Sequence, residues 1–332
     1  MLNVIEEIPR GLLDLPATEL HTMLPGPTLL CLNGIRQQPV FVSVLVHGNE
    51  HTGWEAVRKL LAEYKAGELP RSMVLFIGNV EAARQNRRFL DGQPDFNRIW
   101  SGGTGPEHIM MQQVLEQSRS RNVLMSIDIH NNTGKNPHYA CVNKTYNRFM
   151  QLATLFSSII VYFIRPAGVQ SMAFADICPA VTIECGQSGD AEGTDHVYRY
   201  LQSCLLLDEL PDHAVDHDSY ELFHTVAVVR IPADINFGFK EGMGDLELYN
   251  FIEKYNFTEL PANTEIGKIY PGDRQPFTVQ DERGIEVFNQ YFAVKEGRIF
   301  SRQTLIPSMI TLNTEIISKD CFCYLMERCT AG

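Results

Sequence analysis

Hydrophobic and polar positions alternate between two kinds of pattern up to about residue 210. Mainly apolar runs, each bounded by polar residues, predict buried strands at Pro39–Val46, Met73–Ile77, Val123–Ile129 and Ala180–Glu184. Stretches with apolar residues at helical spacing or with helix-start signals predict helices over 53–64, 106–120, 148–157 and 192–207. Strands that alternate with helices indicate an α/β fold with a largely parallel sheet covered on both faces.

The pattern changes after residue 210. Asp208–Asp218 contains Pro211 and is rich in acidic residues and histidine, so we interpret it as a domain boundary. Beyond it, short apolar runs separated by Gly, Pro and Asn predict strands at Val226–Ile231, Glu265–Tyr270, Ile285–Phe288, Arg298–Leu305 and Cys321–Met326. We therefore expect one domain over residues 1–210 and a smaller, β-rich domain over residues 211–332.

Length and composition agree with two globular domains. The chain has 332 residues, of which 44% are hydrophobic, and a single core stops growing near roughly 250–300 residues. The formal net charge of −12 argues against nucleic acid or an anionic membrane as the main partner, because both favour basic surfaces. A small anionic substrate stays compatible with this charge, since a local cluster of Arg can bind it.

Targeting and cysteine signals point to the cytoplasm. The N-terminus has no basic segment followed by an apolar one, and the most apolar stretch, Leu152–Ile164, falls short of the ~20 residues that span a bilayer. The eight cysteines have no framework spacing, so we expect reduced thiols. We expect a soluble cytoplasmic protein, and the sequence leaves its oligomeric state open, a homo-oligomer included.

Three of the predicted strands end in residues that can bind a metal. The strand ends carry His47-Gly-Asn-Glu50, Asp128-Ile-His130 and Glu184-Cys-Gly186. In open α/β sheets the ligand site lies outside the carboxyl ends of the strands, so these three ends can converge. A bare H-x-x-E motif is weak evidence by itself, and its position at a strand end, with a second strand-end histidine, strengthens it.

The residue types match zinc hydrolase chemistry. Two imidazoles and one carboxylate give zinc three protein ligands and leave a position for water, whose pKa the ion lowers toward ~7. A separate carboxylate must then take the water's proton, and Glu184 is the candidate. Asp128 either orients a ligand imidazole or makes a structural hydrogen bond.

The loop from Asn79 to Trp100 concentrates positive charge. It holds Arg84, Arg87, Arg88 and Arg98, and Asn97 stands directly before Arg98. A guanidinium beside an amide suits a carboxylate, and a second Arg can stabilise an oxyanion. A solvated basic loop is the alternative, but the position between two metal-bearing strands favours substrate binding.

Taken together, these motifs resemble the succinylglutamate desuccinylase/aspartoacylase family, part of the wider group of zinc carboxypeptidase-fold enzymes. The resemblance spans roughly residues 40–200 and rests on His47-Gly-Asn-Glu50, Arg88, Asp95-Phe-Asn97-Arg98-Ile, Asp128-Ile-His130-Asn131 and Glu184. It implies a three-layer zinc carboxypeptidase-like domain with a mostly parallel mixed sheet. The β-rich part is similar in character to the family's capping domain.

The resemblance also implies roles for individual residues. One zinc ion per chain would be bound by His47, Glu50 and His130, and Glu184 would act as general base and then general acid. Arg88 would polarise the scissile carbonyl, and Asn97 with Arg98 would bind the carboxylate of an N-acyl amino acid. Tyr291 stays open between a substrate-binding hydroxyl and a core aromatic residue.

This sequence departs from the family pattern in ways that leave its substrate open. Asn79-Val80 stands where the family commonly has Asn-Pro, and Gly92-Gln-Pro94 is extra. Arg165 lies 19 residues before Glu184, further than the arginine that binds the aspartate side chain in aspartoacylase, so that role is not carried over. The acyl group and the preferred amino acid are thus not defined.

Our main hypothesis is a zinc-dependent deacylase of small anionic N-acyl amino acids. Water activated by zinc and Glu184 would attack the amide carbonyl, Arg88 would stabilise the oxyanion, and Glu184 would return the proton to the amine. The alternatives are a zinc carboxypeptidase that acts on peptide C-termini and a non-catalytic metal- or ligand-binding relative. Among the other histidines, we expect His51 and the pair His213/His217 to bind no metal, His138 to line the site or cap a turn, and His196 to be structural.

Overall fold

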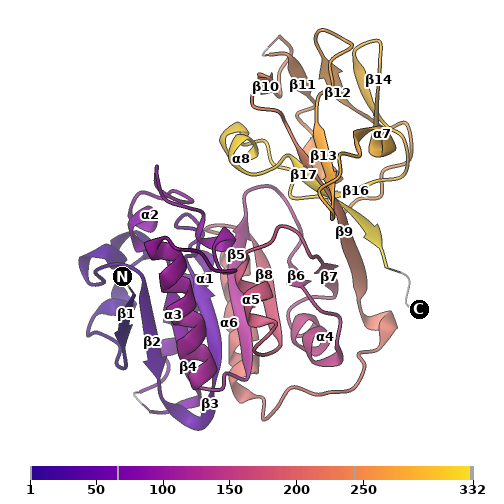
Figure 1. Cartoon of the computed structure of the whole chain (residues 1–332). Coiled ribbons are helices and arrows are strands. Elements are labelled where there is room, and N and C mark those ends of the chain that lie inside the picture. Colours follow the sequence, from indigo (N-terminus) through magenta and orange to yellow (C-terminus); the bar gives the residue numbers. More distant parts are fainter. Residues whose placement is uncertain (1, 66, 243, 330–332) are drawn as a thin grey trace. The chain divides into compact units, whose positions relative to one another are not determined.

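The computed structural model describes residues 2–65, 67–242 and 244–329. It divides the chain into two compact units (Figure 1). The first unit runs to Asn131 and resumes with His138–Glu221, and the second comprises Asn132–Pro137 and the chain from Leu222 onward. The chain therefore leaves the first unit after Asn131, the residue that follows the predicted ligand His130, and returns to it at His138.

A mixed sheet forms the centre of the first unit. Its strands lie in the order β1 (Asn3–Ile5), β2 (Thr28–Leu32), β4 (Leu69–Ile77), β3 (Gly34–Val44), β5 (Met125–Asn132), β8 (Ala180–Gln187), β6 (Tyr139–Val142) and β7 (Ile159–Tyr162). Strand β3 is parallel to both β4 and β5, whereas β2 is antiparallel to β4 and β6 to β8. The predicted α/β class with a mixed sheet is confirmed.

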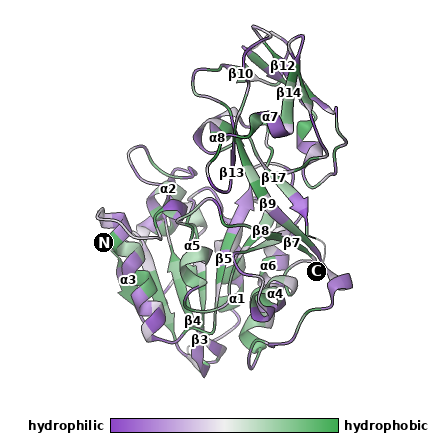
Figure 2. Ribbon diagram, turned by 45° about the vertical axis from the view of Figure 1, so that its right-hand side comes forward, coloured by the Kyte–Doolittle hydropathy of each residue, from purple (hydrophilic) through white to green (hydrophobic). Residues whose placement is uncertain are grey.

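Helices cover both faces of this sheet. Gly53 of α1 (Thr52–Leu61) packs closely on Val44, whereas Phe41 stacks on Phe174 of α5 (Gln170–Phe174) with ring centroids 4.2 Å apart. Because strand residues three apart face opposite sides, α1 and α5 lie on opposite faces, which gives three layers. Figure 2 shows hydrophobic colours along the central strands β3 and β4. The other helices of this unit are α2 (Val80–Arg84), α3 (Pro106–Ser120), α4 (Asn147–Thr154), α6 (Ala191–Leu206) and the 3₁₀ turns Leu12–Asp14, Ala17–Thr22, Phe96–Arg98 and His217–Ser219.

The sequence pattern located most of these elements. The four predicted helices correspond to α1, α3, α4 and α6, and α3 has the predicted bounds. The apolar stretch that begins at Leu152 is divided, since α4 ends at Thr154 and β7 begins at Ile159. The short strands β1, β2, β6 and β7 were not predicted, because their runs of three to five residues carry too little periodicity to separate strand from helix.

The second unit is rich in short strands, as predicted. Strand β9 (Glu221–Arg230) pairs with β13 (Thr278–Asp281) and β17 (Cys323–Arg328), and β17 also pairs with β16 (Ile306–Ser308). A five-stranded sheet has the order β10 (Phe237–Gly238), β11 (Leu246–Leu248), β12 (Glu265–Ile269), β15 (Arg298–Ser301) and β14 (Phe292–Lys295). The remaining elements are α7 (Phe288–Tyr291), α8 (Thr314–Lys319) and a 3₁₀ turn at Ile252–Tyr255. Its role as a capping domain stays a prediction.

One predicted strand of this unit is wrong. Ile285–Phe288 forms an isolated bridge at Glu286 and then enters α7. The Asp281 carboxylate accepts the backbone N–H groups of Arg283 and Ile285 over 2.9 Å each, so a side chain satisfies donors that a sheet partner would otherwise pair.

Two other expectations can be compared with the structure. All eight cysteines lie in the described residues as thiols, and all but Cys329 are buried. Among the described residues, no helix has the length and apolar character needed to cross a bilayer.

Candidate metal centre and active site

The His47–Glu50 turn joins β3 to α1. Leu45, just past the end of β3, is buried and has a φ of 54°, a left-handed conformation that turns the chain out of the sheet. The Glu50 N–H then donates to the His47 carbonyl over 3.2 Å, which closes a tight turn. Only glycine fits at position 48, since an added Cβ would lie 2.3 Å from the Ala83 backbone nitrogen. The turn thereby brings two predicted ligands together.

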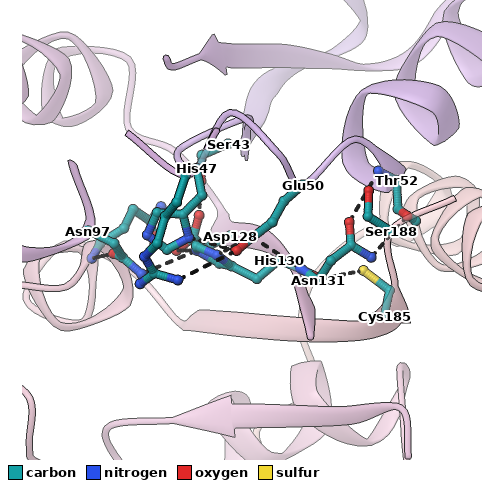
Figure 3. Close-up of polar contacts among 12 residues, drawn as sticks. Ser43, His47, Glu50, Thr52, Asn97, Asp128, His130, Asn131, Cys185 and Ser188 are labelled. Carbon is teal, nitrogen blue, oxygen red and sulfur yellow. Dashed lines mark hydrogen bonds and ion pairs between the residues drawn. The ribbon is translucent and has the colours of Figure 1, made fainter. Parts of the chain in front are cut away.

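The third predicted ligand, His130, reaches the same point from β5 (Figure 3). His47 Nδ1 lies 2.8 Å from Glu50 Oε1, and His130 Nδ1 lies 2.7 Å from Glu50 Oε2. One ligand atom from each of the three residues lies within 4.8 Å of the others, and all three side chains are buried. The structure therefore brings together the two histidines and the glutamate that the sequence placed on two strand ends.

The other ring nitrogen of each histidine contacts a second carboxylate. His47 Nε2 lies 3.0 Å from Asp95 Oδ1, and His130 Nε2 lies 2.9 Å from Asp128 Oδ2. Asp95 and Asp128 can each accept a hydrogen bond from the Nε2–H of the histidine it faces, and this tautomer leaves Nδ1 as the candidate ligand atom. Carboxylate–histidine pairs of this kind orient imidazoles toward metal ions.

The electrostatics of the cluster favour a cation. Burial alone would raise the pKa of Glu50, but His47 and His130 hold it well below its ordinary value. Burial alone would lower the pKa of His130, but Asp128 and Glu50 raise it well above its ordinary value. A divalent cation supplies the same positive charge and displaces protons from its ligands, so this donor set fits a zinc ion.

Glu184 lies beside this cluster on β8, the neighbour of β5 in the sheet. The next residue, Cys185, donates from Sγ to the His130 carbonyl over 2.7 Å (Figure 3). Within the described part of the chain, Glu184 Oε2 is buried and has no hydrogen-bond partner. Burial raises the pKa of Glu184 to about 8, with His130 opposing the rise and Glu50 adding to it. Such a carboxyl group is suited to proton exchange near neutral pH.

The raised pKa of Glu184 predicts a pH effect on the stability of metal-free protein. Between pH 4.5 and about 8 the folded protein retains a proton that the unfolded chain has lost, so stability falls as pH rises through this window. Glu184→Gln removes this ionisation, and its melting temperature should therefore fall less from pH 5 to pH 8 than that of the native protein. Calorimetry of both chelator-treated proteins measures the difference, and parallel melting curves across this range would contradict it.

Arg88 and Asp95 connect the basic loop to the cluster. Arg88 Nη2 lies 3.0 Å from Asp95 Oδ2, and Arg88 Nη1 lies 3.9 Å from Glu50 Oε1. Burial alone would raise the pKa of Asp95, but His47 and Arg88 hold it well below its usual range. Arg87 pairs instead with the exposed Asp91 over 2.7 Å. Arg88 therefore contacts the metal-binding cluster through Glu50.

Asn97 and Arg98 lie on the 3₁₀ turn Phe96–Arg98, which Asp95 caps by accepting the Asn97 N–H over 2.7 Å. The buried Asn97 amide has its Nδ2 3.2 Å from His130 Nε2, and its Oδ1 accepts the Gln170 N–H over 2.9 Å. Arg98 Nη1 donates to the Asn97 carbonyl over 2.9 Å. The structure thus places the Asn-Arg pair beside a candidate metal ligand, and its role in binding a carboxylate stays a prediction.

Other residues considered from the sequence lie in different surroundings. Tyr291 is buried in the hydrophobic core of the second unit, and its role as a substrate-binding residue stays a prediction. His51 contacts the Gly48 carbonyl through Nε2 over 3.0 Å and precedes α1. His138 and His196 contact each other through their Nδ1 atoms over 2.8 Å, so His196 has a partner that the sequence did not indicate.

Ser43 was not identified from the sequence, and Asn131 was recognised only as part of a motif. The Asn131 N–H donates to Glu50 Oε2 over 3.1 Å, and its side chain donates to the Gly186 carbonyl over 2.9 Å. Ser43 donates to Asp128 over 2.6 Å. The position of Asn131 directly after His130 was the available signal, whereas nothing in the sequence distinguished Ser43. Asp95 was recognised only as part of a motif, without its two contacts.

Comparisons with known proteins identify relatives of this chain. Residues 37–201 match the succinylglutamate desuccinylase/aspartoacylase catalytic domain. The chain is 36% identical over 98 residues to the succinylglutamate desuccinylase of Pseudomonas paraeruginosa. This alignment covers 27% of this chain and 29% of that protein. The matched segment is therefore less than a third of the length of that curated relative.

Solved structures show the same fold over a larger part of the chain. The succinylglutamate desuccinylase of Chromobacterium violaceum superposes with a TM-score of 0.59 at 17% identity, covering 89% of this chain and 86% of that one. Murine aminoacylase 3 superposes with a TM-score of 0.57 at 14% identity, covering 89% and 96%. At these identities the two structures establish the fold alone. The match to the catalytic domain shows that residues 37–201 of this chain belong to the succinylglutamate desuccinylase/aspartoacylase family.

Proposed function

We propose that this protein is a zinc-dependent amidohydrolase that removes the acyl group from a small N-acyl amino acid. The observation that carries the proposal is the cluster of His47, Glu50 and His130 beside Glu184, a buried carboxyl group with an unpartnered oxygen among the described residues. The names of the related proteins, succinylglutamate desuccinylase and aminoacylase, support a deacylase.

The three candidate ligands and Glu184 have different tasks in this proposal. A zinc ion held by His47, Glu50 and His130 would supply a bound water of lowered pKa and a Lewis acid for the amide carbonyl. Glu184 takes a proton from the attacking water and returns it to the departing amine nitrogen. The raised pKa of Glu184 suits both steps, because the group must accept and release a proton near neutral pH.

Positively charged residues stabilise and orient the substrate. Arg88 lies close enough to Glu50 to reach the carbonyl oxygen of a substrate at the cluster, where its charge stabilises the oxyanion as the carbon becomes tetrahedral. Asp95 contacts the Arg88 guanidinium and the His47 imidazole at the same time, so it fixes the position of each group relative to the other. Asn97 and Arg98 bind the carboxylate of the amino-acid part.

A metal analysis together with a substrate panel tests the proposal. Purified protein should contain one zinc ion per chain and hydrolyse N-acetyl-aspartate, N-succinyl-glutamate or an N-acetyl aliphatic or aromatic amino acid. Short peptides with a free C-terminus should be cleaved far more slowly. Preferred cleavage of peptides would replace the proposal with a carboxypeptidase, and bound zinc without hydrolysis of any compound would indicate a binding protein.

A further inference from the structure

Ser43 forms the inner end of a chain of polar contacts that leads to the metal-binding cluster. It lies on β3, directly opposite Asp128 of β5 in the parallel register of the two strands. Ser43 Oγ donates to Asp128 Oδ1 over 2.6 Å, and the other oxygen, Oδ2, lies 2.9 Å from His130 Nε2. Figure 3 shows the side chains of Ser43, Asp128, His130 and Glu50 gathered in one region.

Burial makes Asp128 depend on the Ser43 hydroxyl as a hydrogen-bond donor. Ser43 and Asp128 have no solvent-exposed surface, so bulk water does not replace a lost donor at Asp128 Oδ1. A buried acceptor that loses its donor is destabilised, and rotation of the carboxylate is one way to recover a partner. Such a rotation would move Oδ2 away from His130 Nε2, the contact that orients the imidazole.

We propose that Ser43 is a positioning residue of the metal site, which holds the Asp128 carboxylate in the rotation that keeps His130 Nδ1 directed at the metal. The inference rests on the proposed function only in that a metal ion binds His47, Glu50 and His130. It assigns no chemical step to Ser43. Ser43 would affect the affinity for the metal and the geometry of its ligands.

The test is the zinc affinity of Ser43→Ala, measured by competition with a chromogenic chelator. Loss of an outer partner of a metal ligand costs about 10–100-fold in affinity, and Ser43 acts one hydrogen bond further out, so we expect about a tenfold loss. The visible spectrum of the cobalt-substituted variant should also change, since it reports ligand geometry. Ser72→Ala is the matched control, because Ser72 is likewise buried on a neighbouring strand but bonds to the Gly34 N–H instead.

A double-mutant cycle separates positioning from packing. In an Asp128→Asn background, Ser43→Ala should cause little additional loss of zinc affinity, because its route to His130 is already altered. Should Ser43→Ala not fold, Ser43→Cys, with a weaker donor of similar size, is measured in the same way and should lose affinity in the same direction. Circular dichroism and melting curves establish that each variant is folded.

The outcomes are distinct from those of the substrate panel. A zinc affinity of Ser43→Ala within twofold of the native protein, or an equal loss with and without Asp128→Asn, overturns the positioning role. A native protein that binds no zinc overturns both this role and the proposed function. Zinc bound tightly by a protein that hydrolyses nothing contradicts the proposed function alone, since the affinity measurement needs no activity.

Discussion

Glu184→Gln should abolish hydrolysis while leaving the metal in place. Glutamine has almost the same size as glutamate, but it neither accepts the proton of the attacking water nor returns one to the amine. General acid–base catalysis contributes about 10²–10⁴-fold, and Glu184 serves in two successive steps, so we expect kcat to fall by at least about 10³-fold. The measurement is steady-state kinetics on the best substrate of the panel, at saturating concentration.

Zinc content provides the control for this variant. Glu184 is not one of the three residues whose ligand atoms gather in the cluster, so the variant should bind one zinc ion as tightly as the native protein does. Its KM should change little, because substrate binding is assigned to other groups. Unchanged turnover in Glu184→Gln would remove Glu184 from the mechanism, and loss of zinc would move it into the metal site.

His130→Gln should remove both metal binding and activity. His130 is the residue on which the cluster converges, with Glu50 at Nδ1 and both Asp128 and Asn97 at Nε2. Glutamine can donate to one of these carboxylates but offers no imidazole nitrogen, so zinc affinity should fall by more than the ~100-fold that loss of an outer partner costs. Zinc content after dialysis and residual hydrolysis are the two measurements.

A neighbouring histidine supplies the matched control. His51 follows Glu50 directly, yet its Nε2 contacts the Gly48 carbonyl and its ring is not among the clustered ligands. His51→Ala should therefore retain one zinc ion per chain and most of the activity. If His51→Ala lost the metal while His130→Gln kept it, the assignment of the ligands would be wrong.

Residues that act at the ends of strands could be predicted from the sequence with little ambiguity. His47 and Glu50 follow one apolar run, His130 ends a second, and Glu184 ends a third. Since the ligand site of an open α/β sheet lies at the carboxyl ends of its strands, the pattern alone indicated that these four residues meet. Their types, two imidazoles and two carboxylates, restricted the chemistry to a few metal-dependent reactions.

Contacts that depend on the path of a loop could not be predicted in this way. Asp95 reaches His47 across 48 residues, through a loop with no hydrophobic period that would set its position. Arg87 and Arg88 are indistinguishable by composition, and only the backbone course makes one pair with Asp91 and the other with Asp95. The predicted strand over 285–288 was wrong because of another local contact that periodicity does not reveal. The Asp281 side chain accepts backbone N–H groups and so competes with strand pairing.

Hydrophobic periodicity and the local spacing of motifs are properties of the linear sequence, so they were enough to predict the α/β class, the candidate ligands at the strand ends and the family. The tertiary structure decided which side chains support that set. Ser43 meets Asp128 because the parallel register of β3 and β5 places them opposite each other. The pKa of Glu184 is raised mainly by burial, to which the nearby Glu50 and Asp128 add. Register and burial arise when distant segments pack, so these features of the site first appear in the folded protein.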